Sequence, residues 1–150
     1  MLPMIERVED MPVYQLFFAL AAGVEQATRG CGPDFRWLRV QVLRSSESVC
    51  ANMSEGFYAQ YSTEYVQSLY RCRREARETT THLAYGQTVQ QVEEATVARL
   101  LGRYEEALLQ LANVITSLER KIRERGKAKP GAYTLREDEQ PYRGGEETNG

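Results

Sequence analysis

The feature that most constrains the fold is a run of apolar residues spaced alternately four and three apart. Its members are Val97, Leu101, Tyr104, Leu108, Leu111, Ile115, Leu118 and Ile122. This spacing places them on one stripe of an α-helix, and other helices must cover a heptad-like stripe of this length. From Thr88 to Arg125 the helix would be about 55 Å long at 1.5 Å per residue. We therefore expect it to overhang its partners or to break between Thr96 and Gly102.

Three earlier segments show the same helical period, at residues 10–29, 33–58 and 62–86. Pro12 and Pro33 suit the first turns of the first two, and Gly86 suits the end of the third. No alternating strand pattern separates the segments, and their connections are short. The sequence thus predicts an all-α protein, an antiparallel up-down-up-down four-helix bundle over residues 1–125.

The last segment, residues 126–150, is rich in Gly, Pro and charged residues and has no apolar period. Such a composition cannot bury enough apolar surface to offset the loss of chain entropy. We expect a disordered C-terminal tail, or one that orders only on a partner.

The segment 33–58 is apolar on more than one side. Beside its core stripe it carries a second apolar line, formed by Trp37, Val40, Leu43, Cys50, Ala51 and Phe57. One bundle core covers a single stripe, so the second apolar line predicts that this helix is central in the bundle or buried against another subunit. We expect a homo-oligomer.

Composition excludes several functional classes. The formal net charge of −2 argues against a globally basic nucleic-acid binder, although local basic patches remain open. The longest apolar run, residues 16–24, is too short to cross a bilayer and follows acidic rather than basic residues. We expect a cytoplasmic protein without a membrane partner.

The residues needed for catalysis or metal binding are scarce. The chain has one histidine, His82, and three cysteines without a CxxC pair. A di-iron bundle requires two Glu-x-x-His pairs, and a nucleophilic triad requires a base beside its Ser or Cys. We expect no enzyme activity, no metal, no cofactor and three reduced, buried thiols.

Basic residues gather in two places. Arg71, Arg73, Arg74 and Arg77 form the first group, and Arg120, Lys121, Arg123 and Arg125 form the second. One interpretation is a solvated helix face with ion pairs from Arg71 to Glu75 and from Arg74 to Glu78. In the other, Arg73 and Arg77, with no acid four residues away, contact phosphates. Both groups are then predicted nucleic-acid-binding residues.

The segment from Leu43 to Phe57, LRSSESVCANMSEGF, is small and polar for a helix interior. Gly56 within it suggests a close approach between backbones or a nearby helix end. Asn52 and Glu55 could form a hydrogen-bonded pair in a crowded seam. Without a metal ligand or second carboxylate around them, we interpret these residues as a packing motif.

The same segment carries a family resemblance. The matching positions are Ser48, Val49, Ala51, Asn52, Glu55, Gly56 and Phe57, followed by Ser62, Leu69 and Glu78. Over roughly residues 10–122 the chain resembles the four-helix-bundle proteins encoded in intervening sequences of bacterial 23S ribosomal RNA genes. The resemblance marks Ser48, Asn52, Glu55, Gly56 and Glu78 as a structural motif.

That family is similar to the accessory variability determinant proteins of diversity-generating retroelements. Those proteins assemble as homopentameric barrels and bind nucleic acid and a reverse transcriptase. The resemblance therefore implies a pentamer, an RNA or DNA partner and no catalysis. Arg74 and Glu75 stand where intervening-sequence proteins usually carry a small Gly-Ser pair, which favours the retroelement accessory type. The alternative is a protein–protein interaction module that binds no nucleic acid.

Overall fold

The structure, a computed structural model, describes residues 4–126 and confirms the all-α prediction for them. Its elements are the 3-10 helices η1 (Val8–Asp10) and η2 (Pro33–Phe35) and the α-helices α1 (Pro12–Ala27), α2 (Arg36–Phe57), α3 (Ser62–Thr88) and α4 (Glu94–Gly126). Gly126, predicted as the first residue of the tail, is the last residue of α4, and the rest of the predicted tail, residues 127–150, lies outside the described part.

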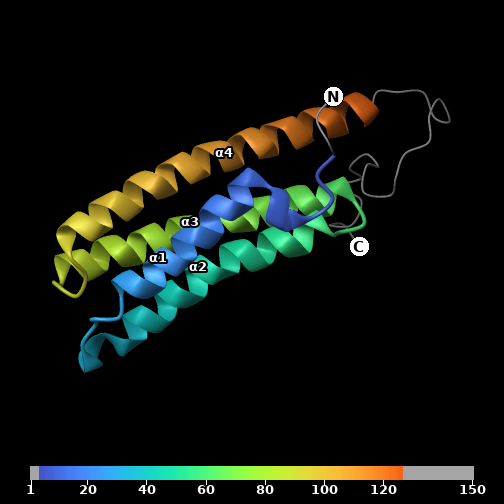
Figure 1. Cartoon of the computed structure of the whole chain (residues 1–150). Helices are drawn as coiled ribbons and strands as arrows, with labels where there is room; N and C mark the ends of the chain where they lie inside the picture. The colour runs from blue at the N-terminus through green and yellow to red at the C-terminus, as the bar shows by residue number, and fades with distance from the viewer. Residues whose placement is uncertain (1–3, 127–150) are drawn as a thin grey trace, which may run out of the picture.

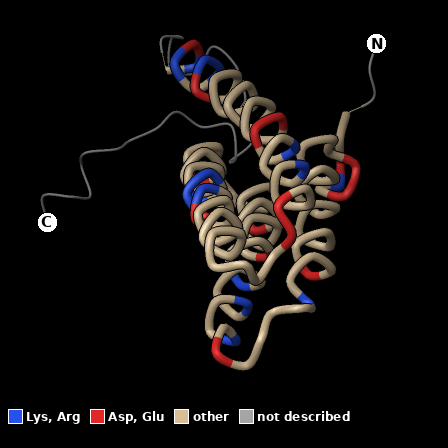
Figure 2. The backbone as a smooth tube through the Cα atoms, turned by 90° about the vertical axis from the view of Figure 1, so that its left-hand side faces the viewer, with Lys and Arg blue, Asp and Glu red and all other residues tan. Residues whose placement is uncertain are grey.

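The four helices form the predicted up-down-up-down bundle. Each helix packs against its neighbour in sequence, and α1 also packs against α4, which closes the ring of contacts. Figure 1 shows successive helices running in opposite directions. The last turns of α4 stand apart from the other helices in both views (Figures 1 and 2). The overhang predicted for the long helix is therefore at its C-terminal end.

Helix α4 differs from its prediction at two points. It begins at Glu94 rather than near Thr88, and it runs unbroken through Gly102. Gly102 is exposed, with open space where a Cβ would lie, so it neither breaks the helix nor serves a close contact. The heptad-like stripe is buried from Val97 to Ile115 except at half-buried Leu101, and Leu118 and Ile122 are only half-buried because α4 leaves the bundle there.

The connection between α3 and α4 explains why the predicted end at Gly86 is two residues early. A Cβ at Gly86 would lie 3.0 Å from Cγ2 of Val92, so the glycine makes room for the returning chain. Its carbonyl oxygen accepts hydrogen bonds from the backbone N–H groups of Gln91 (2.8 Å) and Val92 (3.2 Å). The left-handed residue that follows the helix is Gln90, at φ 62°.

The helix starts also differ slightly from prediction. Asp10, where the first predicted segment begins, belongs to η1, and α1 starts at Pro12 with Met11 before it. Pro33 begins a 3-10 turn, and α2 starts only at Arg36. Both prolines still act as expected, since each starts a turn with its φ already fixed.

Helices α2 and α3 approach very closely at Gly56. A Cβ added there would lie 2.4 Å from Cβ of Ser68 and 3.1 Å from Cδ1 of Tyr65. No ordinary contact between carbon atoms is as short as the first of these distances, so only glycine fits between the two backbones. The close approach predicted from the sequence is therefore present, one residue before α2 ends.

Two structural absences apply to residues 4–126. None of the helices there is both long enough and apolar enough to cross a membrane. Nor does that part of the chain bring together three or more His, Cys, Asp or Glu side chains in a way that could hold a metal ion.

Candidate nucleic-acid interface

All four arginines of α3 line one hollow on the protein surface. The hollow has a volume of about 600 Å³, and its lining is Gln67, Tyr70, Arg71, Arg73, Arg74 and Arg77. The helical period produces this grouping, because residues 70, 73, 74 and 77 are spaced three, four and seven apart and share a face. The sequence-predicted cluster is thus one surface, and it contains an aromatic ring that the prediction missed.

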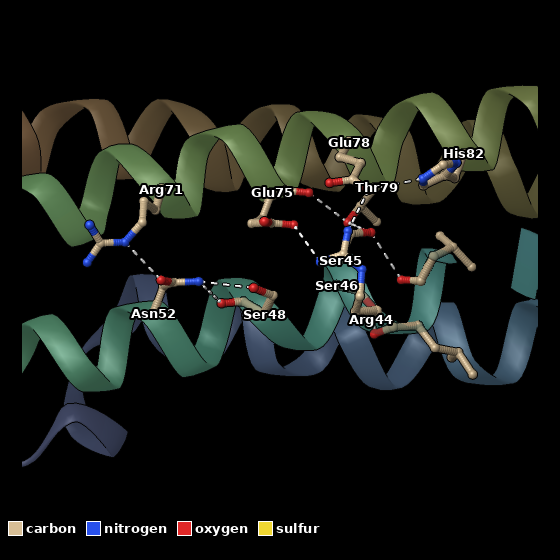
Figure 3. Close-up of polar contacts among 12 residues, drawn as sticks. Arg44, Ser45, Ser46, Ser48, Asn52, Arg71, Glu75, Glu78, Thr79 and His82 are labelled. Carbon is tan, nitrogen blue, oxygen red and sulfur yellow. Dashed lines mark hydrogen bonds and ion pairs between the residues drawn. The ribbon is translucent and has the colours of Figure 1, made fainter. Parts of the chain in front are cut away.

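Arg71 is the anchored member of the group. Its Nε donates to Oδ1 of Asn52 over 3.1 Å, and its Nη2 donates to Oγ of Ser68 over 2.8 Å. Asn52 is held in turn, since its Nδ2 donates to the backbone oxygen (2.8 Å) and Oγ (3.0 Å) of Ser48 (Figure 3). The motif residues Ser48 and Asn52 therefore orient an arginine of the hollow, and Asn52 pairs with Arg71 and not with Glu55, which is exposed.

Arg77 has no acid four residues away, as predicted, but it is not free of an acidic partner. Its Nη1 lies 2.6 Å from Oε1 of Glu105 on α4. The sequence could not indicate this pair, because the partner is on another helix. Both side chains are more than half exposed, and exposed pairs contribute about 0–1 kcal/mol, so a phosphate could compete for Arg77.

Arg73 and Arg74 are the most available cations of the hollow. The guanidinium carbon of Arg73 lies 4.7 Å from the centre of the Tyr70 ring, a cation–π contact. Within residues 4–126, Arg74 has no hydrogen bond or ion pair, and its side chain is exposed. The ion pairs expected within α3, from Arg71 to Glu75 and from Arg74 to Glu78, are not formed.

Arg44 of α2 takes the place of those arginines. Its Nη1 lies 3.6 Å from Oε2 of Glu75, and its Nη2 lies 2.6 Å from Oε1 of Glu78 (Figure 3). Nε2 of His82 lies 3.3 Å from the same Oε1 of Glu78. Glu75 and Glu78 are thereby turned toward α2, and neither lines the hollow. This arrangement separates the positive and negative faces of one helix.

The two carboxyl groups respond differently to this environment. Burial, followed by the neighbouring Glu78, raises the pKa of Glu75. Burial acts in the same direction on Glu78, but the hydrogen bonds from Arg44 and His82 outweigh it and lower its pKa. Glu78, one of the residues that carry the resemblance, is therefore the charged partner of Arg44.

A second hollow, of about 490 Å³, lies between the start of α3 and the end of α4. It is lined by Thr63, Val66, Gln67, Tyr70, Glu119, Ile122, Arg123 and Gly126. Gln67 and Tyr70 line both hollows, so the two are neighbours. The hydroxyl of Tyr70 donates to Oε1 of Glu119, which ties α3 to α4 at this point.

The predicted basic residues of α4 do not form one patch. Arg123 lines the second hollow, but Lys121 lines a different groove, between α1 and α4. Arg120 is exposed and Arg125 is half-buried. Acidic positions lie among the basic ones on these last turns (Figure 2). Of this group, Arg123 is the residue that the structure places next to Tyr70.

The family described as 23S rRNA-intervening sequence protein matches residues 9–113. The match spans α1 to α3 and the first part of α4, and so includes the seam and the arginine hollow but not Arg120 to Arg125. No curated protein is significantly similar to the chain.

Proposed function

The chain belongs to the 23S rRNA-intervening sequence protein family, and from this we propose a non-enzymatic, homo-oligomeric protein that binds nucleic acid through the α3 arginines. One observation carries the proposal. Arg73 and Arg74 line a single hollow with Arg71 and Arg77, while Glu75 and Glu78 of the same helix are paired with Arg44. The lining of the hollow contains four guanidinium groups and no carboxylate, and such a lining suits phosphate groups.

The state of the thiols supports the non-enzymatic part of the proposal. Burial raises the pKa of Cys50 and of Cys72 to about 12. The thiolate is the nucleophilic form, and neither group forms it at neutral pH. Neither thiol is therefore a candidate nucleophile, which supports a role in binding.

Salt titration of nucleic-acid binding tests the proposal. The variant Arg73→Gln with Arg74→Gln removes two charges that make no ion pair within residues 4–126. If each contacts a phosphate, affinity falls and the slope of log K against log salt becomes less steep by about 1.4–1.8. The control, Arg29→Gln with Arg36→Gln, removes the same number of charges from the connection after α1 and from the first residue of α2, and it breaks the ion pair of Arg29 with Glu25.

Equal losses in the two variants would mean that only net charge matters, and no loss in either would refute the arginine hollow as the interface. Binding that does not weaken as salt rises would refute phosphate contact altogether. Melting curves of both variants verify that they remain folded.

The oligomeric part of the proposal rests on an exposed apolar patch. Trp37 and Val40 of α2 are 52% and 55% exposed, and Tyr85 of α3 is 44% exposed with its ring 6.0 Å from that of Trp37. Aromatic side chains left in water on a folded chain are typical of protein interfaces. Trp37 and Val40 belong to the second apolar line that predicted an oligomer, and Tyr85 extends the patch onto α3.

Light scattering after size exclusion tests the assembly. We expect a species near five times the chain mass of 17.2 kDa, and Trp37→Glu should shift it toward one chain. Leu109→Glu is the matched control, because Leu109 is 66% exposed on α4. A wild-type mass of one chain would refute the assembly.

The proposed biological role is that of an accessory factor for the reverse transcriptase of a diversity-generating retroelement. A reverse transcriptase gene beside the gene for this chain, and co-purification of the two proteins, would support it. The alternative, a module that binds only protein, is favoured by the same aromatic patch at Trp37 and Tyr85. It would be supported by partner binding without measurable affinity for nucleic acid.

A further inference from the structure

Tyr70 forms a wall between two hollows of different chemistry. On one side lie the four arginines of α3, in a volume of about 600 Å³. On the other lie Val66 and Ile122, in a largely apolar volume of about 490 Å³ that also contains Arg123. Both volumes are within the range of sites that hold small ligands. A charged, ring-bearing ligand such as a nucleotide has one part suited to each.

The ring of Tyr70 is exposed and yet held in place. It is 38% exposed, its hydroxyl donates to Glu119 of α4, and the guanidinium of Arg73 covers it at 4.7 Å from the ring centre. The hydrogen bond to Glu119 raises the pKa of the phenol. An aromatic ring fixed in this way loses little entropy when a flat ligand stacks beside it.

We propose that Tyr70 stacks against an unpaired base, so that this surface binds single-stranded nucleic acid in preference to a duplex. Phosphates lie in the arginine hollow, and the base lies in the hollow beside Val66 and Ile122. This inference rests on the proposed function and adds the class of nucleic acid to it. It follows from the combination of ring and cations, because a duplex covers the faces of its bases whereas a single strand exposes them.

Charge complementarity favours this occupant over an apolar peptide. Arg123 lines the apolar hollow, and Arg71, Arg73, Arg74 and Arg77 lie on the other side of the same ring. Among the described residues, Glu119 is the one acid in the linings of the two hollows, and its Oε1 accepts the hydrogen bond from Tyr70. A second copy of the chain or its own residues 127–150 are the competing occupants.

The test compares three fluorescent probes of about 15 nucleotides by anisotropy. They are a single-stranded RNA, the same strand annealed in a duplex, and an abasic strand of equal length that keeps the phosphates. We expect the single strand to bind at least about fivefold more tightly than the other two. Tyr70→Leu should weaken binding of the single strand by about 5- to 100-fold and leave the abasic strand and the salt slope unchanged.

Tyr70→Phe is the matched control, because it keeps the ring and removes only the hydrogen bond to Glu119. It should retain most of the affinity. A single strand containing 4-thiouridine should cross-link to the peptide that carries Tyr70 on irradiation.

The outcomes distinguish this inference from the proposed function. Equal binding of all three probes, with Tyr70→Leu behaving as wild type, overturns the stacking role and leaves phosphate binding by the arginines intact. A protein–protein cross-linker applied while the strand is bound gives the other outcome: a Tyr70 peptide joined to a second copy or to residues 127–150 also overturns it. Failure to bind any probe removes the proposed function, and the stacking role with it.

Discussion

Replacing Gly56 by alanine tests the close contact on which the α2–α3 seam depends. The new Cβ would lie 2.4 Å from Cβ of Ser68, about 1 Å closer than the 3.4 Å at which ordinary contacts begin. Ser68 Cβ is bonded directly to the α3 backbone, so no side-chain rotation relieves the overlap. The helices must separate, and overpacking of this kind costs about 1–3 kcal/mol. Alanine regains less than about 1 kcal/mol of helix propensity so near the helix end.

We therefore expect Gly56→Ala to lower the free energy of unfolding by about 2 kcal/mol, a decrease of roughly 4–8 °C in melting temperature. Urea unfolding followed by far-ultraviolet circular dichroism measures the change, at one protein concentration because an oligomer's stability depends on it. Gly102→Ala is the matched control. No atom lies within 4 Å of the position that a Cβ on Gly102 would take, so this variant should be more stable by about 0.5–1 kcal/mol.

A double-mutant cycle identifies the atom responsible. Ser68→Gly removes the Cβ that clashes with the methyl group introduced by Gly56→Ala, whereas Ser68→Ala removes only the hydroxyl and keeps that Cβ. Both variants lose the hydrogen bond from Arg71, so this loss cancels in the comparison. We expect Ser68→Gly, and not Ser68→Ala, to rescue Gly56→Ala by about 1 kcal/mol or more. A Gly56→Ala variant as stable as wild type, or additive double mutants, would refute the reasoning.

Three further predictions concern buried polar groups. Tyr104→Phe should leave stability unchanged or raise it by up to about 1 kcal/mol in thermal melts, because the buried Tyr104 hydroxyl has no hydrogen-bond partner within residues 4–126; a loss would imply a bond through water. In native protein a thiol reagent should label half-buried Cys31 alone, and the buried Cys50 and Cys72 only after unfolding. Burial and Glu78 raise the pKa of Glu75, so the folded state holds its proton more tightly and wild-type stability falls as pH rises through that pKa. Glu75→Gln should therefore gain stability over wild type above that pKa, with the difference vanishing below about pH 4 in urea titrations; a constant difference would contradict the assignment.

The fold was predictable because helical periods are local. Apolar spacing placed the four helices, and short connections fixed their alternating directions. Helix ends were less predictable, since they depend on contacts distant in sequence. Gly86 resembles a cap, but its lack of a side chain accommodates Val92, and Gln90 takes the left-handed backbone instead. The sequence of α3 alone does not contain that information.

The residues that line the candidate site could be predicted from the sequence, but their ion-pair partners could not. Spacing along α3 placed Tyr70 on the face of Arg73 and Arg77, and this signal was available although the prediction did not use it. Ion pairs between different helices leave no such signal in the sequence. Arg44 and Glu105 are 34 and 28 positions from their partners Glu78 and Arg77, and only the packed bundle brings them together.

The family motif and the arginine hollow are connected through Ser68. Gly56 lets α3 approach α2 so closely that Ser68 lies against it, and the Oγ of Ser68 accepts a hydrogen bond from Arg71. Asn52, one turn before Gly56 on α2, accepts the second hydrogen bond from the same guanidinium. A half-buried cation held at two points keeps its direction, so the charge of Arg71 adds to the field of the hollow without the entropy of a free side chain. Residues interpreted from the sequence as a packing motif therefore also orient a charge of the neighbouring helix.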